Sequence, residues 1–403
     1  MKLSRRTILA GGAAALAPLP ATAAPSLHQR LICLDTHLDT PASLARPGWN
    51  MMQRHAEDST QVDYPRMVAG GLDGGFFAIY TPQGPLTPDG MAAARDAALL
   101  RAMEIRELAA AHPRQFELAF AAEDAAHIAA SGKRIVYQSI ENAYPLGEDI
   151  SLLNLFYKLG VRMLGFIHFK NNQFGDSATD KPLWNGLSPK GRQLAALGSD
   201  LGMVLDASHA SDLVFDQLME MSRAPIILSH SGCRAVFDHP RNIDDDRIKK
   251  LAAAGGTIQI NSYNSYLIAV PSNPDRDKAR AALGEKRRTI STMTPGEAAI
   301  AMREVARDMK EIEARYPEPR ATFEMYMQHV THALDLVGPD HVGVGCDWDG
   351  GGGVTGMEDV AAIPKITERL VKLGYTETQL AAFWGGNALR VLKAAHQARK
   401  TAS

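Results

Sequence analysis

Short apolar runs of strand length recur along the chain from residue 31 onward, and longer amphipathic stretches separate them. Their length and their enrichment in branched residues are typical of buried β-strands. We expect eight strands from this pattern. They cover Leu31–Leu34, Gly75–Tyr80, Arg134–Ile140, Arg162–His168, Gly202–Leu205, Pro225–Leu228, Gly256–Ile260 and His341–Gly345.

The stretches between these runs carry helical patterns. The clearest are Met91–Ala111, Asp124–Ala130, Ser151–Leu159, Pro189–Leu201, Ser211–Met221 and Asp244–Ala254. Strands that alternate with helices pair in parallel through right-handed crossovers. The pattern therefore predicts an α/β fold, a closed (β/α)₈ TIM-like barrel. An open doubly wound sheet is the second choice, and no G-x-G-x-x-G follows the first strand to favour it.

One connection is much longer than the others. About 80 residues separate the seventh expected strand from the eighth, far beyond an ordinary loop. This insertion contains the charged stretch Ser272–Arg288 and a long helical pattern over Pro295–Ala314. We expect it to serve as a lid or a subunit contact. Two segments after the last strand, Ile366–Leu373 and Thr376–Ala395, are expected to be closing helices.

The N-terminus has the pattern of an export signal. A twin arginine, Arg5-Arg6, lies in Ser4-Arg-Arg-x-x-Leu9 and precedes a run of small apolar residues, and Ala21-Thr-Ala23 fits a cleavage site. An ordinary export signal with two chance arginines is the alternative. We predict a twin-arginine signal peptide over residues 1–23 and one barrel domain over 24–403. No later run is long enough to span a membrane, so we expect a soluble periplasmic protein.

Composition excludes some partners. Hydrophobic residues make up 45% of the chain, which permits a large core, and the formal net charge is −2. Without a basic stripe, nucleic acid is not an expected partner. The three cysteines, Cys33, Cys233 and Cys346, form no C-x-x-C pair, and we interpret them as buried apolar residues.

Histidines and carboxylates follow six of the eight expected strands. They are His37 and Asp39, Glu141, His168, Asp206 with His209, His230, and Asp347. In a parallel barrel the carboxyl ends of all strands meet at one mouth. Neutral imidazoles and carboxylates are metal ligands, and they outnumber what one four-coordinate ion needs. We therefore predict two metal ions, a pair suited to hydrolysis. Zn²⁺ fits these ligands best, with Mn²⁺ or Co²⁺ as alternatives.

Several motifs, in order along nearly the whole chain, resemble one known family. They are Asp35-x-His-x-Asp39, Val62-Asp-Tyr-Pro-Arg66 with Gly70-Gly71, Gly160-Val-Arg162 leading to His168, Gly186-Leu-Ser-Pro-x-Gly191, Leu205-Asp-x-Ser-His209, Ser229-His-Ser231, His239-Pro-Arg-Asn242, His341-Val-Gly-Val-Gly-x-Asp-Trp-Asp-Gly350 and Gly385-Gly-Asn-x-Leu-Arg390. With these motifs the chain resembles the membrane (renal) dipeptidases, binuclear zinc metallopeptidases with an amidohydrolase-like barrel.

The resemblance implies a role for each matching residue. His37 and Asp39 would hold one zinc ion, His209 and His230 the other, and Glu141 would bridge them. Asp347 would hold the bridging water or hydroxide and move its proton. His168 would contact the scissile carbonyl oxygen, and Arg241 would bind the free carboxylate of the substrate.

The resemblance also implies a reaction, the hydrolysis of L-Xaa-L-Xaa and L-Xaa-D-Xaa dipeptides by a metal-bridged hydroxide, and a homodimer. Two departures from the family concern the pocket: Asn142-Ala-Tyr144 follows Glu141 in place of smaller residues, and Trp348 replaces a commoner Phe. Two other functions stay open. One is a different amide or lactone hydrolase on the same metal pair, and the other is a non-catalytic periplasmic binding protein.

Overall fold

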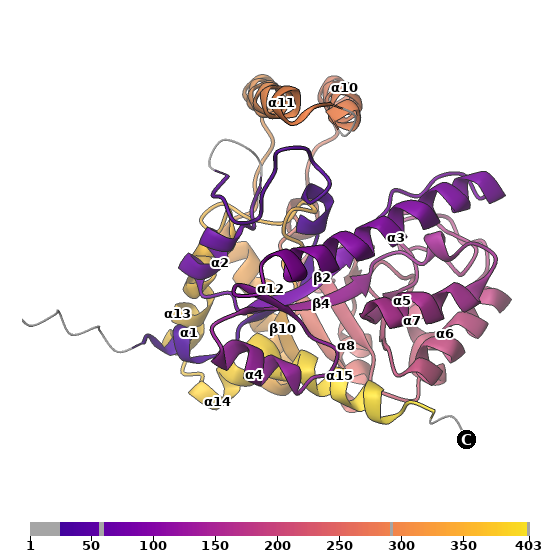
Figure 1. Cartoon of the computed structure of the whole chain (residues 1–403). Coiled ribbons are helices and arrows are strands. Elements are labelled where there is room, and N and C mark those ends of the chain that lie inside the picture. Colours follow the sequence, from indigo (N-terminus) through magenta and orange to yellow (C-terminus); the bar gives the residue numbers. More distant parts are fainter. Residues whose placement is uncertain (1–24, 56–59, 291–292, 401–403) are drawn as a thin grey trace, which may run out of the picture.

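The computed structural model describes residues 25–55, 60–290 and 293–400. The expected signal peptide lies outside these residues. Eight parallel strands form the centre of the molecule (Figure 1). In sheet order they are β1 Leu34–Leu38, β2 Gly74–Ile79, β4 Arg134–Ile140, β5 Val161–Gly165, β6 Val204–Asp206, β7 Ile227–Cys233, β9 Thr257–Ile260 and β10 Val342–Val344.

The sheet curves until its two ends meet. A single parallel bridge between Leu38 and Trp348 joins the first strand to the segment after the last one, and the Asp39 N–H donates to Trp348 O at 2.9 Å. This nearly closed parallel barrel confirms the predicted TIM-like fold.

Helices surround the barrel, and most lie where the sequence predicts them. The outer helices are α2 Tyr64–Gly70, α3 Pro88–Ala111, α4 Asp124–Ala130, α5 Leu153–Leu159, α6 Pro189–Leu201, α7 Asp212–Met221, α8 Asp245–Ala253, α12 Phe323–Val337 and α13 Pro364–Lys372. Their first residues follow from N-caps. Ser188, Ser211 and Asp244 each accept a hydrogen bond from the N–H three residues later, which satisfies a donor that the first helical turn leaves free.

The lower end of the barrel in Figure 1 is closed by the C-terminal segment. We expected one helix over 376–395, but the structure has α14 Glu377–Ala381, a π-helical turn over Ala382–Gly386 and α15 Asn387–Gln397. Gly385 in this turn packs closely against the start of the barrel, since an added Cβ there would lie 2.8 Å from Ile32 O.

Strand boundaries differ from the prediction in three places that affect the site. β5 ends at Gly165, before His168, and β7 continues past its predicted end at Leu228 to Cys233, so that His230 lies within it. The first strand begins at Leu34, three residues later than the apolar run. His37 consequently lies within β1, and Asp39 follows it at the mouth. Two short strands were not predicted, β3 Phe116–Leu118 and β8 Asn242–Ile243, and they pair with β4 and β7 at the edges of the sheet.

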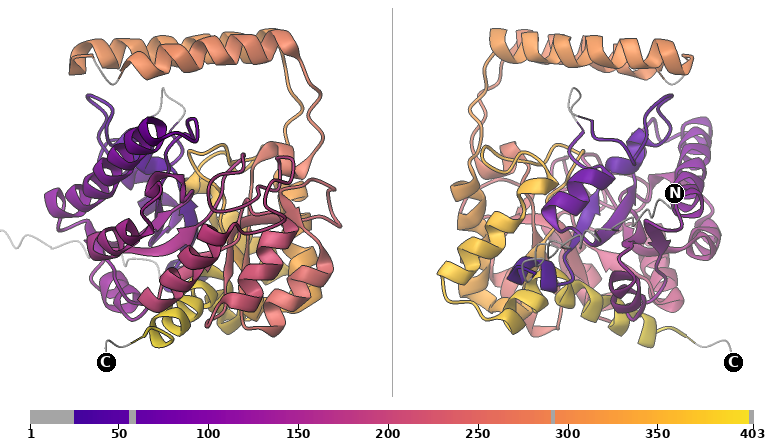
Figure 2. Two further views of the ribbon diagram at one scale, coloured as in Figure 1. Left: turned by 90° about the vertical axis from the view of Figure 1, so that its right-hand side faces the viewer. Right: turned by 60° about the vertical axis from the view of Figure 1, so that its left-hand side comes forward.

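Among the described residues, four α-helices lie between β9 and β10. They are α9 Asn264–Leu267, α10 Pro274–Thr289, α11 Pro295–Arg315 and the outer helix α12. Helices α10 and α11 pair with each other above the carboxyl ends of the strands, and two extended segments connect them to the barrel (Figure 2). Among the described helices, none is long and apolar enough to cross a membrane.

Candidate metal centre

Seven ionisable side chains from six strands and the loops that follow them lie together at the mouth of the barrel. They are His37 on β1, Asp39 after β1, Glu141 after β4, His168 after β5, His209 after β6, His230 on β7 and Asp347 after β10. Their atoms form three overlapping groups within 4.8 Å. The structure thus brings together all the expected metal ligands and the two expected catalytic residues.

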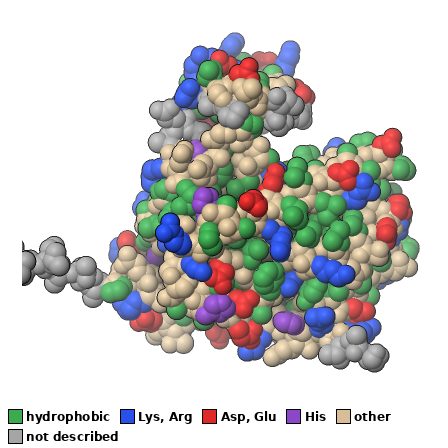
Figure 3. All heavy atoms as spheres, in the orientation of Figure 1, with side chains coloured by type: hydrophobic (Ala, Val, Ile, Leu, Met, Phe, Trp, Pro, Cys, Tyr) green, Lys and Arg blue, Asp and Glu red, His purple; other side chains and the backbone are tan. Residues whose placement is uncertain are grey.

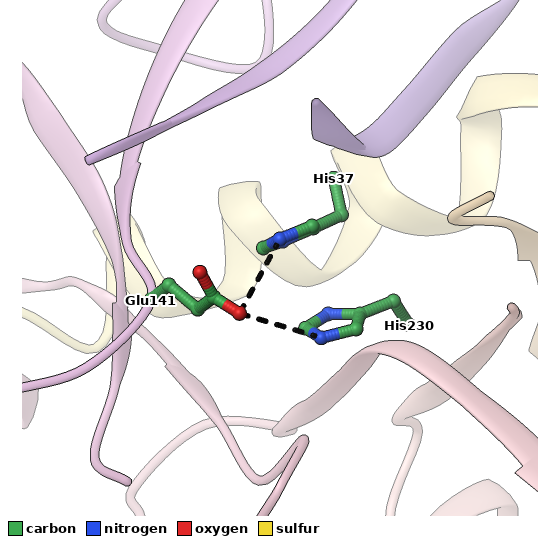
Figure 4. Close-up of side chains that lie close together, drawn as sticks. All are labelled: His37, Glu141 and His230. Carbon is green, nitrogen blue, oxygen red and sulfur yellow. Dashed lines mark ion pairs between the residues drawn. The ribbon is translucent and has the colours of Figure 1, made fainter. Parts of the chain in front are cut away.

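Glu141 is at the centre of this cluster. Its Oε1 lies 3.3 Å from His168 Nε2, 3.3 Å from His209 Nε2, 3.7 Å from His37 Nε2 and 3.9 Å from His230 Nε2. Figure 4 shows the carboxylate of Glu141 pointing between the rings of His37 and His230. The four imidazole nitrogens thus all lie around one carboxylate oxygen, Oε1.

The second carboxylate of the cluster, Asp39, faces His37 from the other side. Asp39 Oδ2 lies 3.5 Å from His37 Nε2, and Asp347 belongs to the same group of potential ligands. Asp347 and His209 both have a φ of 65°. Non-glycine residues adopt this left-handed conformation rarely, and it is often found at functional sites.

A chain of hydrogen bonds behind the cluster orients His230. Ser229 Oγ donates to Asp206 Oδ2 at 2.5 Å and accepts from His230 Nδ1 at 2.8 Å. Because Nδ1 carries the proton, the lone pair of His230 Nε2 points into the cluster, where His209 Nε2 lies 2.9 Å away. A partner that fixes the tautomer in this way is typical of histidines that bind metals.

The surroundings of the histidines at the mouth favour different charge states. They favour the neutral form of His209 and His230 and the protonated form of His37. Burial, with Arg241 nearby, holds the pKa values of His209 and His230 well below the usual range. Burial alone would also lower the pKa of His37, but Asp39 and Glu141 raise it to about 10. For Glu141, the imidazoles of His168 and His37 outweigh burial and hold its pKa well below the ordinary value.

The polar atoms that lack a partner test whether a cation fits. Among the described residues, four buried atoms of the cluster have no hydrogen-bond partner: His37 Nε2, Asp39 Oδ1, Glu141 Oε2 and His209 Nδ1. A buried polar atom without a partner is strongly destabilising. Imidazole nitrogens and carboxylate oxygens are the ligands that zinc and similar ions use. The side chains present therefore fit metal ions.

Arg241 adds a fixed positive charge beside the cluster. It is only 4% exposed, its Nη2 donates to His230 O at 3.1 Å, and its Nε has no partner. The guanidinium lies 5.1 Å from the centre of the Tyr266 ring, which itself stacks against Tyr263. This buried guanidinium with a free donor has the chemistry to bind a carboxylate.

Some residues around the cluster were missed in the sequence. Asn261 follows β9, and its Nδ2 donates to Asp347 Oδ2 at 3.4 Å. Tyr80 follows β2, and its ring centre is 5.1 Å from that of His168. These are the two strand ends to which no residue was assigned. The rule that sites form at the carboxyl ends of barrel strands would have pointed to them.

Comparison with known proteins now gives the family. The sequence profile of the membrane dipeptidases, peptidase family M19, matches residues 21–403. The chain belongs to this family. A relative from Claviceps purpurea, dipeptidase tcpJ, is 28% identical over 338 residues, which cover 82% of this chain and 68% of that protein. The chain spans about half the length of two other curated dipeptidases.

Two solved structures match the fold closely. The probable dipeptidase PvdM from Pseudomonas aeruginosa gives a TM-score of 0.77 at 31% identity, covering 92% of this chain and 97% of that one. A metallopeptidase from Rhodobacter sphaeroides, which binds a phosphinate mimic of L-Ala-D-Ala, gives 0.71 at 25% identity, covering 91% and 99%. These matches confirm the expected enzyme class, a metallodipeptidase.

Proposed function

We propose that this chain hydrolyses L-Xaa-L-Xaa and L-Xaa-D-Xaa dipeptides with two divalent metal ions, and that Zn²⁺ is the preferred metal. His37 and Asp39 would hold one ion, His209 and His230 the other, and Glu141 both. Such a pair supplies Lewis acidity and lowers the pKa of bound water. The positions of Glu141 among four imidazole nitrogens and of the buried atoms without partners support this assignment.

The buried guanidinium of Arg241 carries the proposal of a dipeptide substrate. Its free Nε and its place beside His230 favour a substrate whose carboxylate lies close to the scissile bond. In a dipeptide the terminal carboxylate is one residue beyond that bond, whereas a longer peptide would place an uncharged amide there. The phosphinate mimic of L-Ala-D-Ala bound by the Rhodobacter sphaeroides relative supports acceptance of a D-residue at this second position.

His168 and Asp347 would act on the reacting atoms. His168 Nε2 faces the centre of the cluster, 3.3 Å from Glu141 Oε1, and would donate to the carbonyl oxygen as negative charge develops on it. Burial, together with Asp39 and Glu141, raises the pKa of Asp347 to about 8 in the absence of metal. A carboxylate in this position would take the proton of the attacking water and transfer it to the leaving amine.

A substrate panel with an Arg241→Ala variant tests the proposal. We expect the zinc-loaded protein to hydrolyse L-L and L-D dipeptides and to hydrolyse their C-terminal amides poorly. Arg241→Ala should lose the preference for the free carboxylate, mainly through KM. Arg192→Ala, at an exposed position on α6, is the matched control and should keep it. Equal losses on acids and amides would indicate another amide or lactone hydrolase, and metal binding without turnover would indicate a binding protein.

We also propose that the twin-arginine segment exports the folded chain to the periplasm. The motif Ser4-Arg-Arg-x-x-Leu9 supports it. Replacing both arginines with lysine (Arg5→Lys/Arg6→Lys) should leave the protein in the cytoplasm, as measured by cell fractionation. Export of this variant at the normal rate would contradict the proposal.

A further inference from the structure

Asp35 belongs to the first motif of the chain, but the proposed function gives it no role. It lies on β1 two residues before His37, it is only 1% exposed, and it is in none of the three groups of potential metal ligands. On the face shown in Figure 3, by contrast, acidic side chains lie at the surface among basic ones. A buried carboxylate is costly unless hydrogen bonds compensate for the lost water. The partners of Asp35 therefore indicate its role.

Both oxygens of Asp35 accept hydrogen bonds from backbone N–H groups of the site. Oδ1 accepts from the His37 N–H at 2.9 Å, and Oδ2 accepts from the Cys346 N–H at 3.0 Å. His37 is a proposed metal ligand, and Cys346 directly precedes Asp347, the proposed proton carrier. Such charge-assisted bonds are stronger than bonds between neutral groups. Asp35 thus joins the segment that holds a ligand to the segment that holds the proton carrier.

This link crosses the seam at which the barrel closes. Strands β1 and β10 are the two ends of the hydrogen-bonded strand order. Among the described residues, the bridge that joins their segments is a single one, between Leu38 and Trp348. Thr36 Oγ1 also donates to Val344 O at 3.2 Å. Side chains of β1, Asp35 among them, therefore help to set its position relative to β10.

The other half of the site has a carboxylate with the same pattern of bonds. Asp206 on β6 accepts from the Ser208 N–H, two residues further on, at 2.9 Å and from the Ser229 N–H on β7 at 3.0 Å. Each of these serines directly precedes a proposed histidine ligand. Asp206 thus lies behind the ligands of one ion, and Asp35 has the corresponding place behind the other.

Gly350 limits the same segment from the solvent side. It is exposed, and a Cβ built on it would lie 2.0 Å from Asp39 Oδ2 and 2.2 Å from Asp347 Oδ1. The residue before it, Asp349, accepts from the Thr40 hydroxyl at 2.6 Å, which holds the segment in place. The two carboxylates can therefore keep these positions only while residue 350 has no side chain.

We propose that Asp35 and Gly350 are positioning residues, which hold Asp347 at a fixed distance from the metal ion that His37 and Asp39 would bind. The inference rests on the proposed function, because it takes Asp347 as the proton carrier. Asp35 fixes the backbone behind the site, and the absence of a side chain at Gly350 leaves room for the two carboxylates in front of it. A displacement of about 1 Å can lower a rate by about 100-fold, so small changes at either residue should reach the chemistry.

Asp35→Asn in the zinc-loaded protein tests the first residue. The amide keeps one acceptor and turns an NH₂ group towards the other backbone N–H, which then loses its partner. We expect the affinity for one of the two Zn²⁺ ions, measured by chelator competition without substrate, to fall by about 10–100-fold. On a dipeptide, kcat should fall and KM should stay nearly the same.

Asp73→Asn is the matched control. Asp73 Oδ2 also accepts from a backbone N–H, that of Cys33 at 2.9 Å, but at the opposite end of β1 from the site. This variant should keep the metal affinities and kcat of the parent. Parental metal affinity and kcat in Asp35→Asn, or an equal loss in Asp73→Asn, would overturn the proposal.

Gly350→Ala is the second test, and it removes no hydrogen bond from the fold. The added methyl group should displace Asp39 and Asp347, so the affinity for one Zn²⁺ ion should again fall by about 10-fold or more. Gly284→Ala on α10, where a Cβ would meet nothing within 4 Å, is the matched control. A raised KM with parental metal affinity would mean that the methyl group only obstructs the substrate, which would overturn the proposal. If the parent bound two ions but hydrolysed no dipeptide, the proposed function would fail, and the metal affinities of the variants would still decide the role of Asp35 and Gly350.

Discussion

The mouth of the barrel and the arm, which is the helix pair α10 and α11 within residues 274–315, are held together in opposite ways. At the mouth, side chains from six strands and their following loops converge within a few ångströms, and each depends on elements far away in sequence. In the arm, two consecutive helices pack on each other around five buried apolar residues. Hydrogen bonds from Asn264 to Pro319 and Ala321 join the two segments that connect these helices to the barrel. The mouth is polar, buried and non-local, whereas the arm is local and largely exposed.

Because of this difference, we expect substitutions in the two regions to affect different properties of the protein. Buried polar groups are costly unless they are satisfied, and the groups at the mouth are held in place by strands from the whole barrel. The arm can open without exposing the barrel core, because the two share no apolar cluster among the described residues. We therefore expect changes at the mouth to act on turnover and metal affinity and changes in the arm to act on local order.

The largest effect is expected at Asp347. Asp347→Asn keeps the size of the side chain but removes its ability to accept a proton. If Asp347 is the general base, kcat should fall by about 10²–10⁴-fold. Steady-state kinetics on a dipeptide, with metal content measured by mass spectrometry, checks this expectation. A variant that kept its metal and its full kcat would show that proton transfer takes place elsewhere.

A smaller effect, on metal affinity, is expected from a change at Ser229, whose hydroxyl bonds to the ring of His230. Ser229→Ala removes the hydroxyl that links Asp206 to His230 Nδ1 and leaves the ring free to rotate. Loss of such a partner typically lowers metal affinity or activity by about 10–100-fold. Competition with a chelator measures the affinity, and excess zinc should restore turnover. Ser199→Ala is the control, since Ser199 Oγ on α6 is buried without a partner. Equal affinities in the two variants would contradict the proposed link.

The sequence was sufficient to predict the barrel and the position of its mouth. Apolar runs recurred at the spacing of βα units, and the histidines and carboxylates fell at the ends of those runs. His168, His209 and His230 therefore converge as expected. Because the rule for barrel mouths is topological, small errors in strand boundaries did not matter. β1 begins three residues later than predicted, and His37 and Asp39 still lie at its carboxyl end.

What the sequence could not predict depends on three-dimensional packing. The bond from Ser229 to Asp206 and the contact of Arg241 with Tyr266 join residues on different elements, and no local spacing encodes them. At the π-helical turn over Ala382–Gly386, Gly385 packs closely against Ile32, a contact between segments far apart in the sequence. The direction in which the arm extends is set by Asn264 and Glu318, whose partners lie some 40 to 60 residues away.

The smallest effect on catalysis is expected from a substitution in the apolar cluster between the two helices of the arm. Such a substitution also allows the stability of the two regions to be compared quantitatively. Leu283 in the arm and Leu194 on α6 are both buried, at 5% and 0% exposure. Replacing either with alanine should remove about 2–5 kcal/mol of local packing. Leu194→Ala should lower the free energy of unfolding of the barrel. Leu283→Ala should speed amide hydrogen exchange in residues 274–315 alone, with kcat/KM on dipeptides unchanged. If Leu283→Ala also weakened protection in β7 or β9, the arm and the barrel would form one cooperative unit, and the separation argued above would be wrong.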